Sequence, residues 1–310
     1  MAERTADNVA WAGAKPTLSV LIPFLRDDPS VLLAALDREA VSLTGAVEVV
    51  VLDDGTGDRA LTQRLKALTS SLTLPLRLDT LAANLGRAKG RNRLAGQARG
   101  RWLLFLDSDM LPDSPGFLAA YLALIAEQAP AVAFGGFSLL QAPPRPEHAL
   151  HRRMALASDC APLAQRRAEP EKYVYTSNLL VRRDVFETIA FDEAFKGWGW
   201  EDVEWAMRVQ QQHPILHIDN TATHLGLDSA PAMAAKYEQS AANFARVVAA
   251  HLEVVSRYPS YRAARLLKRA PLRSAWRPAL KAIALMEHAP LAARALAMRL
   301  YRAALYSETV

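Results

Sequence analysis

The chain has 310 residues, of which 51% are hydrophobic and 22% charged, with a formal net charge of +5 at pH 7. A globular chain of this length can bury a core that needs no disulfide or metal to fold. Cys160 is the only cysteine, which favours a reducing, cytoplasmic compartment. No apolar run reaches the roughly 18 residues of a membrane span, and residues 1–15 lack the hydrophobic region of a signal peptide. The composition argues against a secreted, transmembrane or disulfide-rich protein.

The positive charge is concentrated at one end of the chain. Residues 260–310 hold ten Lys or Arg residues and two Glu residues, a net charge of +8, which leaves −3 for the rest. Such asymmetry is typical of a segment that meets an anionic partner, either a membrane surface or a nucleic acid.

Apolar runs alternate with segments of helical spacing through the first hundred residues. The runs predict strands, and the spaced segments predict helices. The strands are expected over 17–24, 47–52, 76–81 and 102–106, and the helices over 29–43, 60–72 and 88–99. This alternation implies right-handed crossovers and a mainly parallel sheet of the α/β class.

The second half is less regular. We expect a helix capped by Asp113-Ser114-Pro115 and a long mobile loop over 143–172, which is rich in proline and charge. Further strands are predicted over 132–139, 174–182 and 214–218, and further helices over 184–189, 201–212 and 233–258. Beyond these, prolines recur at short intervals, which favours short helices over one long helix.

Three short segments lie at the carboxyl ends of predicted strands. They are Pro23-Phe24-Leu25, the pair Asp53-Asp54 and the triplet Asp107-Ser108-Asp109. Because ligands of parallel sheets bind at the carboxyl ends of the strands, the three segments predict a site at one edge. The carboxylates of the triplet can bind Mg²⁺ or Mn²⁺, and Asp53-Asp54 can accept hydrogen bonds from a base or ribose. A solvated turn is the structural alternative for each.

Two further segments carry chemistry. The helix that opens near Gly86 holds Arg87, Lys89 and Arg91, and a helix start with cations suits a diphosphate; a solvated helix face is the alternative. The string from Gly197 to Asp202 combines two Trp residues with two acids.

In that string, Trp198 and Trp200 can stack on a sugar while Glu201 and Asp202 accept from hydroxyls, and a carboxylate there can act as a general base. The alternative is a helix start with acids in its first turn and Trp in the core. His224 can complete a metal shell begun by Asp109, although a lone histidine is more often structural.

The order of these motifs resembles that of family 2 glycosyltransferases of the GT-A type, over roughly residues 17–230. Gly-Trp-Gly-x-Glu-Asp also looks like the corresponding string of β-1,4-galactosyltransferase-type enzymes, whose metal-binding histidine His224 resembles. The resemblance implies a mixed, mainly parallel sheet flanked by helices. It also implies an inverting, metal-dependent transfer of a sugar from a nucleotide-sugar, usually UDP-linked, to a hydroxyl of a glycan or a lipid-linked acceptor.

The resemblance also implies a role for each motif residue. By position, Pro23, Asp53 and Asp54 would hold the uridine, Arg91 would lie near the nucleotide, and Asp107 would contact ribose or sugar. Asp109 and His224 would hold Mn²⁺ or Mg²⁺. Glu201 would bind a sugar, Trp198 and Trp200 would contact the acceptor, and Asp202 would be the base. One departure concerns Phe24-Leu25, where the family often has Thr and an aromatic residue, so the base-stacking contact does not carry over.

These roles divide the chain into four parts. We expect a flexible N-terminus over 1–14, a nucleotide-sugar half over 15–110, an acceptor and catalytic half over 111–258, and a basic helical tail over 259–310. Either the tail contacts an anionic membrane at the inner face, or it packs as a helical subdomain. Nucleic acid is not expected, because no aromatic-basic platform accompanies the charge.

Two other functions remain open at this point. One is a catalytically silent nucleotide-sugar or glycan-binding protein, which the intact carboxylates and histidine argue against. The other is a sugar-phosphate nucleotidyltransferase, which would need a Gly- and Arg/Lys-rich loop after the first strand. Residues 23–30 hold no such loop.

Overall fold

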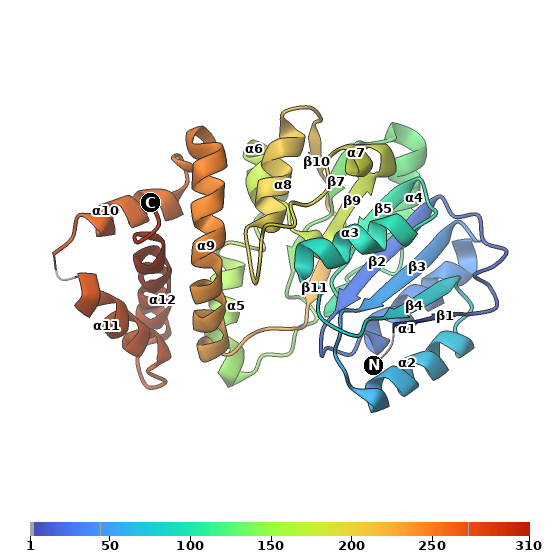
Figure 1. Ribbon diagram of the computed structural model, residues 1–310, viewed down its shortest axis with the longest axis horizontal. Helices are drawn as coiled ribbons and strands as arrows, with labels where there is room; N and C mark the ends of the chain where they lie inside the picture. Colours follow the sequence, from blue (N-terminus) through green and yellow to red (C-terminus); the bar gives the residue numbers. More distant parts are fainter. Residues whose placement is uncertain (1–2, 44, 272) are drawn as a thin grey trace. The chain divides into compact units, whose positions relative to one another are not determined.

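A computed structural model describes residues 3–43, 45–271 and 273–310. The chain forms two compact units, each assembled from separate stretches of sequence (Figure 1). Unit 1 holds residues 1–142, 160–193 and 205–226, and unit 2 holds residues 143–159, 194–204 and 227–310. No helix in the described parts of the chain combines the length and the apolarity that crossing a membrane requires.

Unit 1 is built on an eight-stranded mixed sheet. Its strand order is β1-β4-β3-β2-β5-β9-β7-β10. The bounds are β1 (Arg4–Asp7), β2 (Leu18–Phe24), β3 (Val47–Asp53), β4 (Leu76–Thr80), β5 (Trp102–Phe105), β7 (Val132–Phe134), β9 (Leu179–Arg182) and β10 (Ile215–His217). Strands β4, β3, β2 and β5 are mutually parallel, whereas β1 and β9 run antiparallel to their neighbours. The α/β class and the mainly parallel sheet are therefore confirmed.

Helices cover both faces of this sheet (Figure 1). Along β2, Val20 and Ile22 belong to one core cluster and Leu21 to the other, because successive side chains of a strand point to opposite faces. The first cluster takes residues from α1 (Ser30–Ala40), α2 (Arg59–Ser71) and α4 (Phe117–Gln128), and the second from α3 (Arg87–Gln97), α7 (Arg183–Thr188) and α8 (Glu201–Gln210). Burial on both faces explains why these strands read as continuous apolar runs.

A second, three-stranded sheet lies in unit 1. It consists of β6 (Met110–Pro112), β11 (Ala222–His224) and β8 (Phe137–Ser138) in the order β6-β11-β8. Asp113 ties it together, since its carboxylate accepts hydrogen bonds from Ser138 at 2.6 Å, Thr221 at 2.7 Å and Thr223 at 2.6 Å. Burial opposes ionisation of Asp113, but these hydroxyl donors lower its pKa overall. Asp113 is thus not the helix cap that we expected, and α4 begins only at Phe117.

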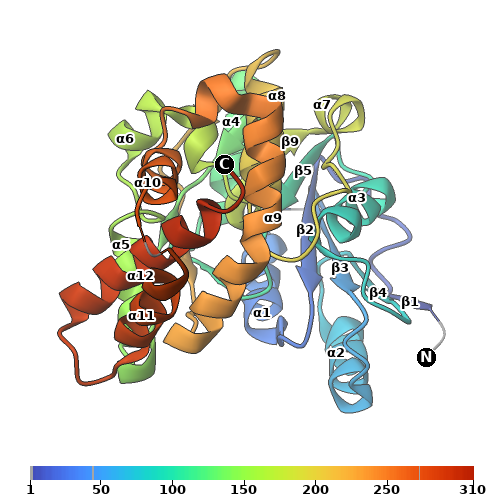
Figure 2. The same ribbon diagram turned by 60° about the vertical axis from the view of Figure 1, so that its left-hand side comes forward.

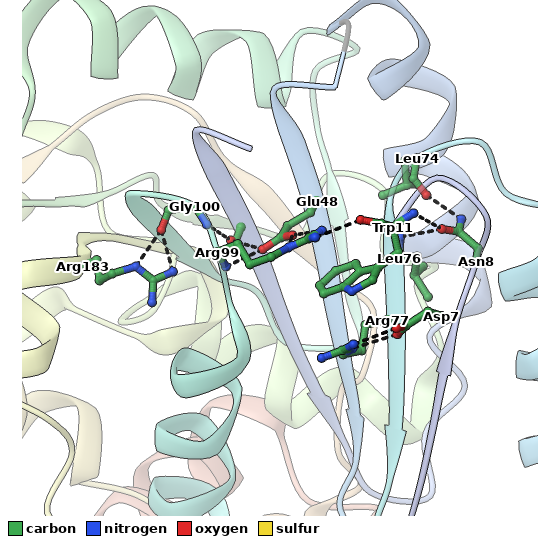
Figure 3. Close-up of polar contacts among 11 residues, drawn as sticks. Asp7, Asn8, Trp11, Glu48, Leu74, Leu76, Arg77, Arg99, Gly100 and Arg183 are labelled. Carbon is green, nitrogen blue, oxygen red and sulfur yellow. Dashed lines mark hydrogen bonds and ion pairs between the residues drawn. The ribbon is translucent and has the colours of Figure 1, made fainter. Parts of the chain in front are cut away.

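The N-terminal segment differs from the flexible stretch expected over 1–14. Residues 4–7 form β1, an edge strand paired with β4, and the buried Trp11 ring lies under the guanidinium of Arg99 at 3.8 Å (Figure 3). Arg99 also pairs with the fully buried Glu48 of β3 at 2.7 Å (Figure 3). The edge strand is short and reads Arg-Thr-Ala-Asp, so it leaves no apolar run in the sequence, and these attachments are visible only in the folded chain.

Two expectations for the middle of the chain were wrong. The loop over 143–172 instead contains four short helices, namely η2 (Pro146–His148), α5 (Ala149–Leu156), α6 (Leu163–Ala168) and η3 (Pro170–Tyr173). The strand over 132–139 divides into β7 and β8 at Gly135-Gly136. A Cβ at Gly135 would lie 2.3 Å from the hydroxyl oxygen of Tyr121, so close packing selects glycine there.

Unit 2 is helical, and its helices lie side by side in both views (Figures 1 and 2). They are α5, α9 (Ala230–Val255), α10 (Pro259–Lys268), α11 (Arg273–Leu285) and α12 (Leu291–Tyr306). Helix α12 contacts each of the other four. The described residues of 259–310 therefore form a packed helical subdomain, which was the second of the two arrangements expected for the basic tail. Prolines open α10 and precede α12 as expected, whereas Pro278 lies inside α11.

A buried guanidinium and a buried imidazole join α6 to the main sheet of unit 1. Arg166 donates to Ile218 O at 3.0 Å and lies 3.3 Å from His217 Nδ1, while His217 Nε2 lies 3.0 Å from Pro170 O. Arg166 Nη1 can only donate, so Nδ1 accepts and the imidazole is neutral, with its proton on Nε2. Burial, with the charges of Arg166 and Arg167, lowers the pKa of His217 to about 4.

This histidine predicts a loss of stability at mildly acidic pH. The unfolded chain protonates His217 near its ordinary pKa of 6.5, but the folded chain does so only near 4, so the free energy of unfolding falls as pH drops through this window. At pH 5 the loss relative to pH 7 is about 2 kcal/mol. Urea unfolding at both pH values measures it. His217→Gln is expected to remove this part of the pH dependence, and the control His213→Gln to keep it. An unchanged pH dependence in His217→Gln would contradict the assignment.

Candidate functional site

The carboxyl ends of β2, β3 and β5 lie along one edge of the main sheet. These strands are parallel neighbours, and the backbone amide of Asp54 donates to Phe24 O at 2.9 Å just past their ends. Pro23 is half-buried and is the second-to-last residue of β2. Asp53 ends β3, is buried, and accepts a hydrogen bond from the Thr56 amide at 2.8 Å. The structure thus aligns the strand ends that the sequence marked as polar.

Asp54 holds the loop that leads into α3. Its carboxylate accepts from the side-chain amide of Asn84 at 3.0 Å and from the backbone amides of Leu85 at 2.7 Å and Gly86 at 3.1 Å. Burial, together with the charge of Asp53, raises the pKa of Asp54 in spite of these donors. Gly55 lets the loops touch, since a Cβ there would lie 2.5 Å from the carbonyl carbon of Ala83. The observed contacts of Asp54 organise two loops of this edge.

Arg91 of α3 reaches the triplet after β5. Its guanidinium pairs with Asp107 at 2.9 Å, and its side chain is 2% exposed. A buried arginine paired with a partly exposed carboxylate holds that carboxylate in one orientation. The structure therefore joins the α3 motif to the Asp-x-Asp triplet, as a single site requires.

Asp109 and His224 lie 115 residues apart in sequence and meet in the structure. The antiparallel register of β6 and β11 places His224 opposite Met110, and the Leu225 amide donates to Asp109 O at 2.8 Å. His224 Nε2 consequently lies 3.0 Å from Asp109 Oδ2. Burial opposes ionisation of Asp109, but the contact with His224 and the charges of His224 and Arg87 lower its pKa.

Gly226 is a site residue that the sequence analysis missed. A Cβ at this position would lie 2.0 Å from Asp109 Oδ2, a separation that no real side chain tolerates. Glycine therefore lets the chain after β11 pass beside the carboxylate while Asp109 keeps its present position. Its position two residues after His224 was the one signal in the sequence, and it identifies Gly226 only once the pairing of β6 with β11 is known.

The donor set fits a divalent cation that is shared with a substrate. Asp109 is held ionised, and His224 presents Nε2 to the same carboxylate. Within residues 3–43, 45–271 and 273–310, no group of three or more His, Cys, Asp or Glu side chains is arranged to enclose a metal. Mg²⁺ is commonly bound through one or two carboxylates, with water and substrate phosphates completing its shell. The pair therefore fits an ion that arrives with a phosphate-bearing ligand.

The aromatic and acidic string lies in unit 2. Glu201 is 4% exposed, Asp202 is half-buried, and both stand in the first turn of α8. Trp198 is half-buried, with its ring 5.9 Å from that of Tyr237. Trp200 is half-buried and donates its indole N–H to Tyr306 at 2.9 Å.

Residues 19–190 match the family described as Glycosyl transferase family 2. This span includes the ends of β2, β3 and β5 and the start of α3, and it stops before the string at 197–202 and before His224. The search of curated proteins gave no match.

Solved structures share the fold at low sequence identity. TarS 1–349 from S. aureus is 20% identical to this chain with a TM-score of 0.52, and the match covers 92% of this chain and 89% of TarS 1–349. The complex of TarS 1–349 with UDP-GlcNAc is 19% identical with a TM-score of 0.51, and the match covers the same shares of the two chains, 92% and 89%. Mannosyltransferase PcManGT from Pyrobaculum calidifontis, in complex with GDP-Man and Mn²⁺, is 16% identical with a TM-score of 0.56, covering 96% of this chain and 88% of its own. At these identities the likeness shows a common fold.

The close approach at Gly226 predicts the effect of a single methyl group. Gly226→Ala is expected to displace Asp109 and to lengthen the distance from Oδ2 to His224 Nε2 beyond about 3.5 Å, the limit of a hydrogen bond. A crystal structure of the variant measures this distance. Gly96→Ala is the control, because a Cβ at Gly96 meets nothing within 4 Å. A variant that keeps the pair at its present distance would show that the backbone near residue 226 can yield.

Proposed function

Since the chain belongs to glycosyl transferase family 2, we propose that it transfers a sugar from a UDP-sugar to a hydroxyl of a glycan or lipid-linked acceptor, with inversion at the anomeric carbon. The observation that carries the proposal is the Asp109–His224 pair. Asp109 belongs to the same Asp107-Ser108-Asp109 triplet as Asp107, which forms an ion pair with Arg91. The complexes of TarS with UDP-GlcNAc and of PcManGT with GDP-Man and Mn²⁺ support a nucleotide-sugar as the donor class.

Residues of unit 1 are assigned to the donor. Pro23, Asp53 and Asp54 are proposed to hold the base and ribose of the nucleotide at the carboxyl edge of the sheet. Arg91 acts through its ion pair with Asp107, which keeps that carboxylate oriented toward ribose or sugar hydroxyls. Because Asp54 also holds the loop before α3, it supports the donor site through the backbone as well.

Asp109 and His224 are the proposed ligands of Mn²⁺ or Mg²⁺. A bound cation would neutralise negative charge on the departing diphosphate. The contribution of the chain is to keep Asp109 ionised, to hold the imidazole beside it through the β6–β11 register, and to leave room for both beside Gly226. Two protein ligands leave coordination positions for the phosphate oxygens of the donor.

Residues of unit 2 are assigned to the acceptor. Asp202 is proposed to take the proton from the attacking hydroxyl, while Glu201 accepts hydrogen bonds from a sugar. The attack occurs opposite the departing nucleotide in a single displacement, so one bond forms to the anomeric carbon as the bond to the diphosphate oxygen breaks. Trp198 offers an apolar ring to the acceptor. Trp200 contributes by holding the loop that leads into α8, from which Glu201 and Asp202 project.

A screen of UDP-, GDP- and dTDP-sugars for donor hydrolysis and transfer, with Mn²⁺ and with excess EDTA, tests the function. We expect activity with a UDP-sugar that EDTA removes and that Asp109→Ala abolishes. Asp202→Asn is expected to bind the donor normally and to lose 10²- to 10⁴-fold in kcat, roughly the usual contribution of a general base.

Each contrary result has a defined meaning. Full activity in EDTA would overturn the metal role of Asp109 and His224. Loss of donor binding in Asp202→Asn would make Asp202 structural, with Glu201 the next candidate for the base. Donor binding without hydrolysis or transfer under any condition would indicate the silent binding protein instead.

We also propose that residues 260–310 contact an anionic membrane at its cytoplasmic face. Helix α10 exposes Arg262, Arg265 and Leu266 to solvent, and α11 exposes Trp276 and Ile283. Cations beside exposed apolar side chains, with one Trp, match the composition of helices that lie in a bilayer interface. Packing on α9 and α12 uses other faces of these helices, so it does not compete with this contact.

Vesicle co-sedimentation tests the membrane contact. The chain is expected to bind vesicles that contain phosphatidylglycerol at low salt and to be released by high salt. Replacing Arg262, Arg265 and Arg269 by Gln should weaken binding about 100-fold, at about 1 kcal/mol per charge. The control replaces Arg38, Arg59 and Arg64 of unit 1, which changes the net charge equally. Equal effects of the two triple variants, or no binding by the wild type, would contradict the proposal.

A further inference from the structure

The backbone at Trp200 is held in an unusual conformation. Its φ of +77° lies in the left-handed region, which is sterically costly for a residue with a bulky side chain and persists only where the surroundings hold it. Its carbonyl accepts from the Glu204 amide at 2.9 Å, which closes the first turn of α8. Trp200 therefore sets the direction in which Glu201 and Asp202 leave the loop.

A directed chain of hydrogen bonds holds the side chain of Trp200. The indole N–H can only donate, so Tyr306 Oη accepts it at 2.9 Å. Ser240 Oγ donates to Tyr237 O at 2.8 Å, which leaves Ser240 as the acceptor for the Tyr306 hydroxyl at 2.8 Å. Each of the three protons in this series of hydrogen bonds has one acceptor, and Tyr306 is the central residue of the series.

Packing fixes the same residues. Tyr306 is 1% exposed, and its ring stacks on Phe244 at 4.2 Å with an interplanar angle of 19°. The Trp200 ring lies 4.9 Å from Phe244 on α9. Asn243 of α9 donates to Lys196 O and Gly199 O, both at 2.9 Å. The loop is thus tied to α9 by its backbone and to α12 by the indole of Trp200.

We propose that Tyr306 is a positioning residue for the transfer reaction, because its hydroxyl holds Trp200 and thereby aims Asp202. The inference rests on the proposed role of Asp202 as the base. It gives α12, which lies beyond every sequence motif of the site, a part in turnover. A displacement of about 1 Å at a reacting group can cost roughly 100-fold in rate, so loss of this hydroxyl should be measurable.

Tyr306→Phe tests the proposal, with Tyr301→Phe as the matched control. Both residues are buried in α12. Tyr306→Phe removes the two hydrogen bonds of its hydroxyl, with Trp200 and Ser240, and Tyr301→Phe removes one, to the charged carboxylate of Glu238. We expect Tyr306→Phe to lower kcat roughly 10- to 100-fold with an unchanged KM for the donor, and Tyr301→Phe to keep kcat near that of the wild type. Thermal midpoints should fall by similar amounts in the two variants, which separates positioning from stability.

A double variant makes the test specific to the base. In an Asp202→Asn background, Tyr306→Phe is expected to add no further loss of kcat, because the group that it aims is already absent. Equal kcat values for the two tyrosine variants, or a full further loss in the double variant, would overturn the inference while leaving Asp202 as the base. A wild-type kcat for Asp202→Asn would instead overturn the proposed base itself.

Discussion

Parallel alignment of β4, β3, β2 and β5 is the constraint on which the rest of unit 1 depends. Parallel strands hydrogen-bonded in register must end near one another, and each of these strands returns through a helix on one of the two faces. Whatever follows their carboxyl ends therefore gathers at one edge. The residues that follow are acidic after β3 and β5, so charge accumulates there.

Carboxylates gathered in this way repel one another unless the fold supplies donors. Asp107 has the guanidinium of Arg91, Asp109 has His224, and Asp113 has three hydroxyls. These donors lie on α3, β8 and β11 or beside them, so the same contacts that keep the carboxylates in place also join α3, β8 and β11 to the segment that follows β5. Stability and site geometry share these interactions, and a small change such as a methyl group at Gly226 acts on both.

Unit 2 shows how a segment without a motif can bear on a site. Residues 259–310 appear in the sequence as a basic appendage, yet α12 buries two tyrosines against α9 and holds Trp200 from within the core. Arg262 and Arg265 of α10 and Arg277 of α11 point to solvent, whereas Ala264 of α10 and Leu280 and Ala284 of α11 are buried in the packing. A surface that attracts anions and a core that steadies a loop can thus belong to the same three helices.

The sequence by itself determined the parallel core and the identity of the polar strand ends. Strands buried on both faces require continuous apolar runs, so the runs at 17–24, 47–52 and 102–106 locate β2, β3 and β5 to within a residue or two. The same patterns predicted α1, α2 and α3. They also ordered the acidic and basic motifs well enough to indicate the family that residues 19–190 match.

Only the tertiary structure decided the contacts between distant, weakly patterned segments. Strands β1 and β11 are too short to show a periodicity, and the helices over 143–172 are interrupted by proline and charge. The pairing of Asp109 with His224, the need for glycine at 226 and the support of Trp200 by Tyr306 follow from the β6–β11 register and the packing of α12 on α9. A local sequence specifies local conformation, whereas these contacts depend on which surfaces meet when the chain buries its core.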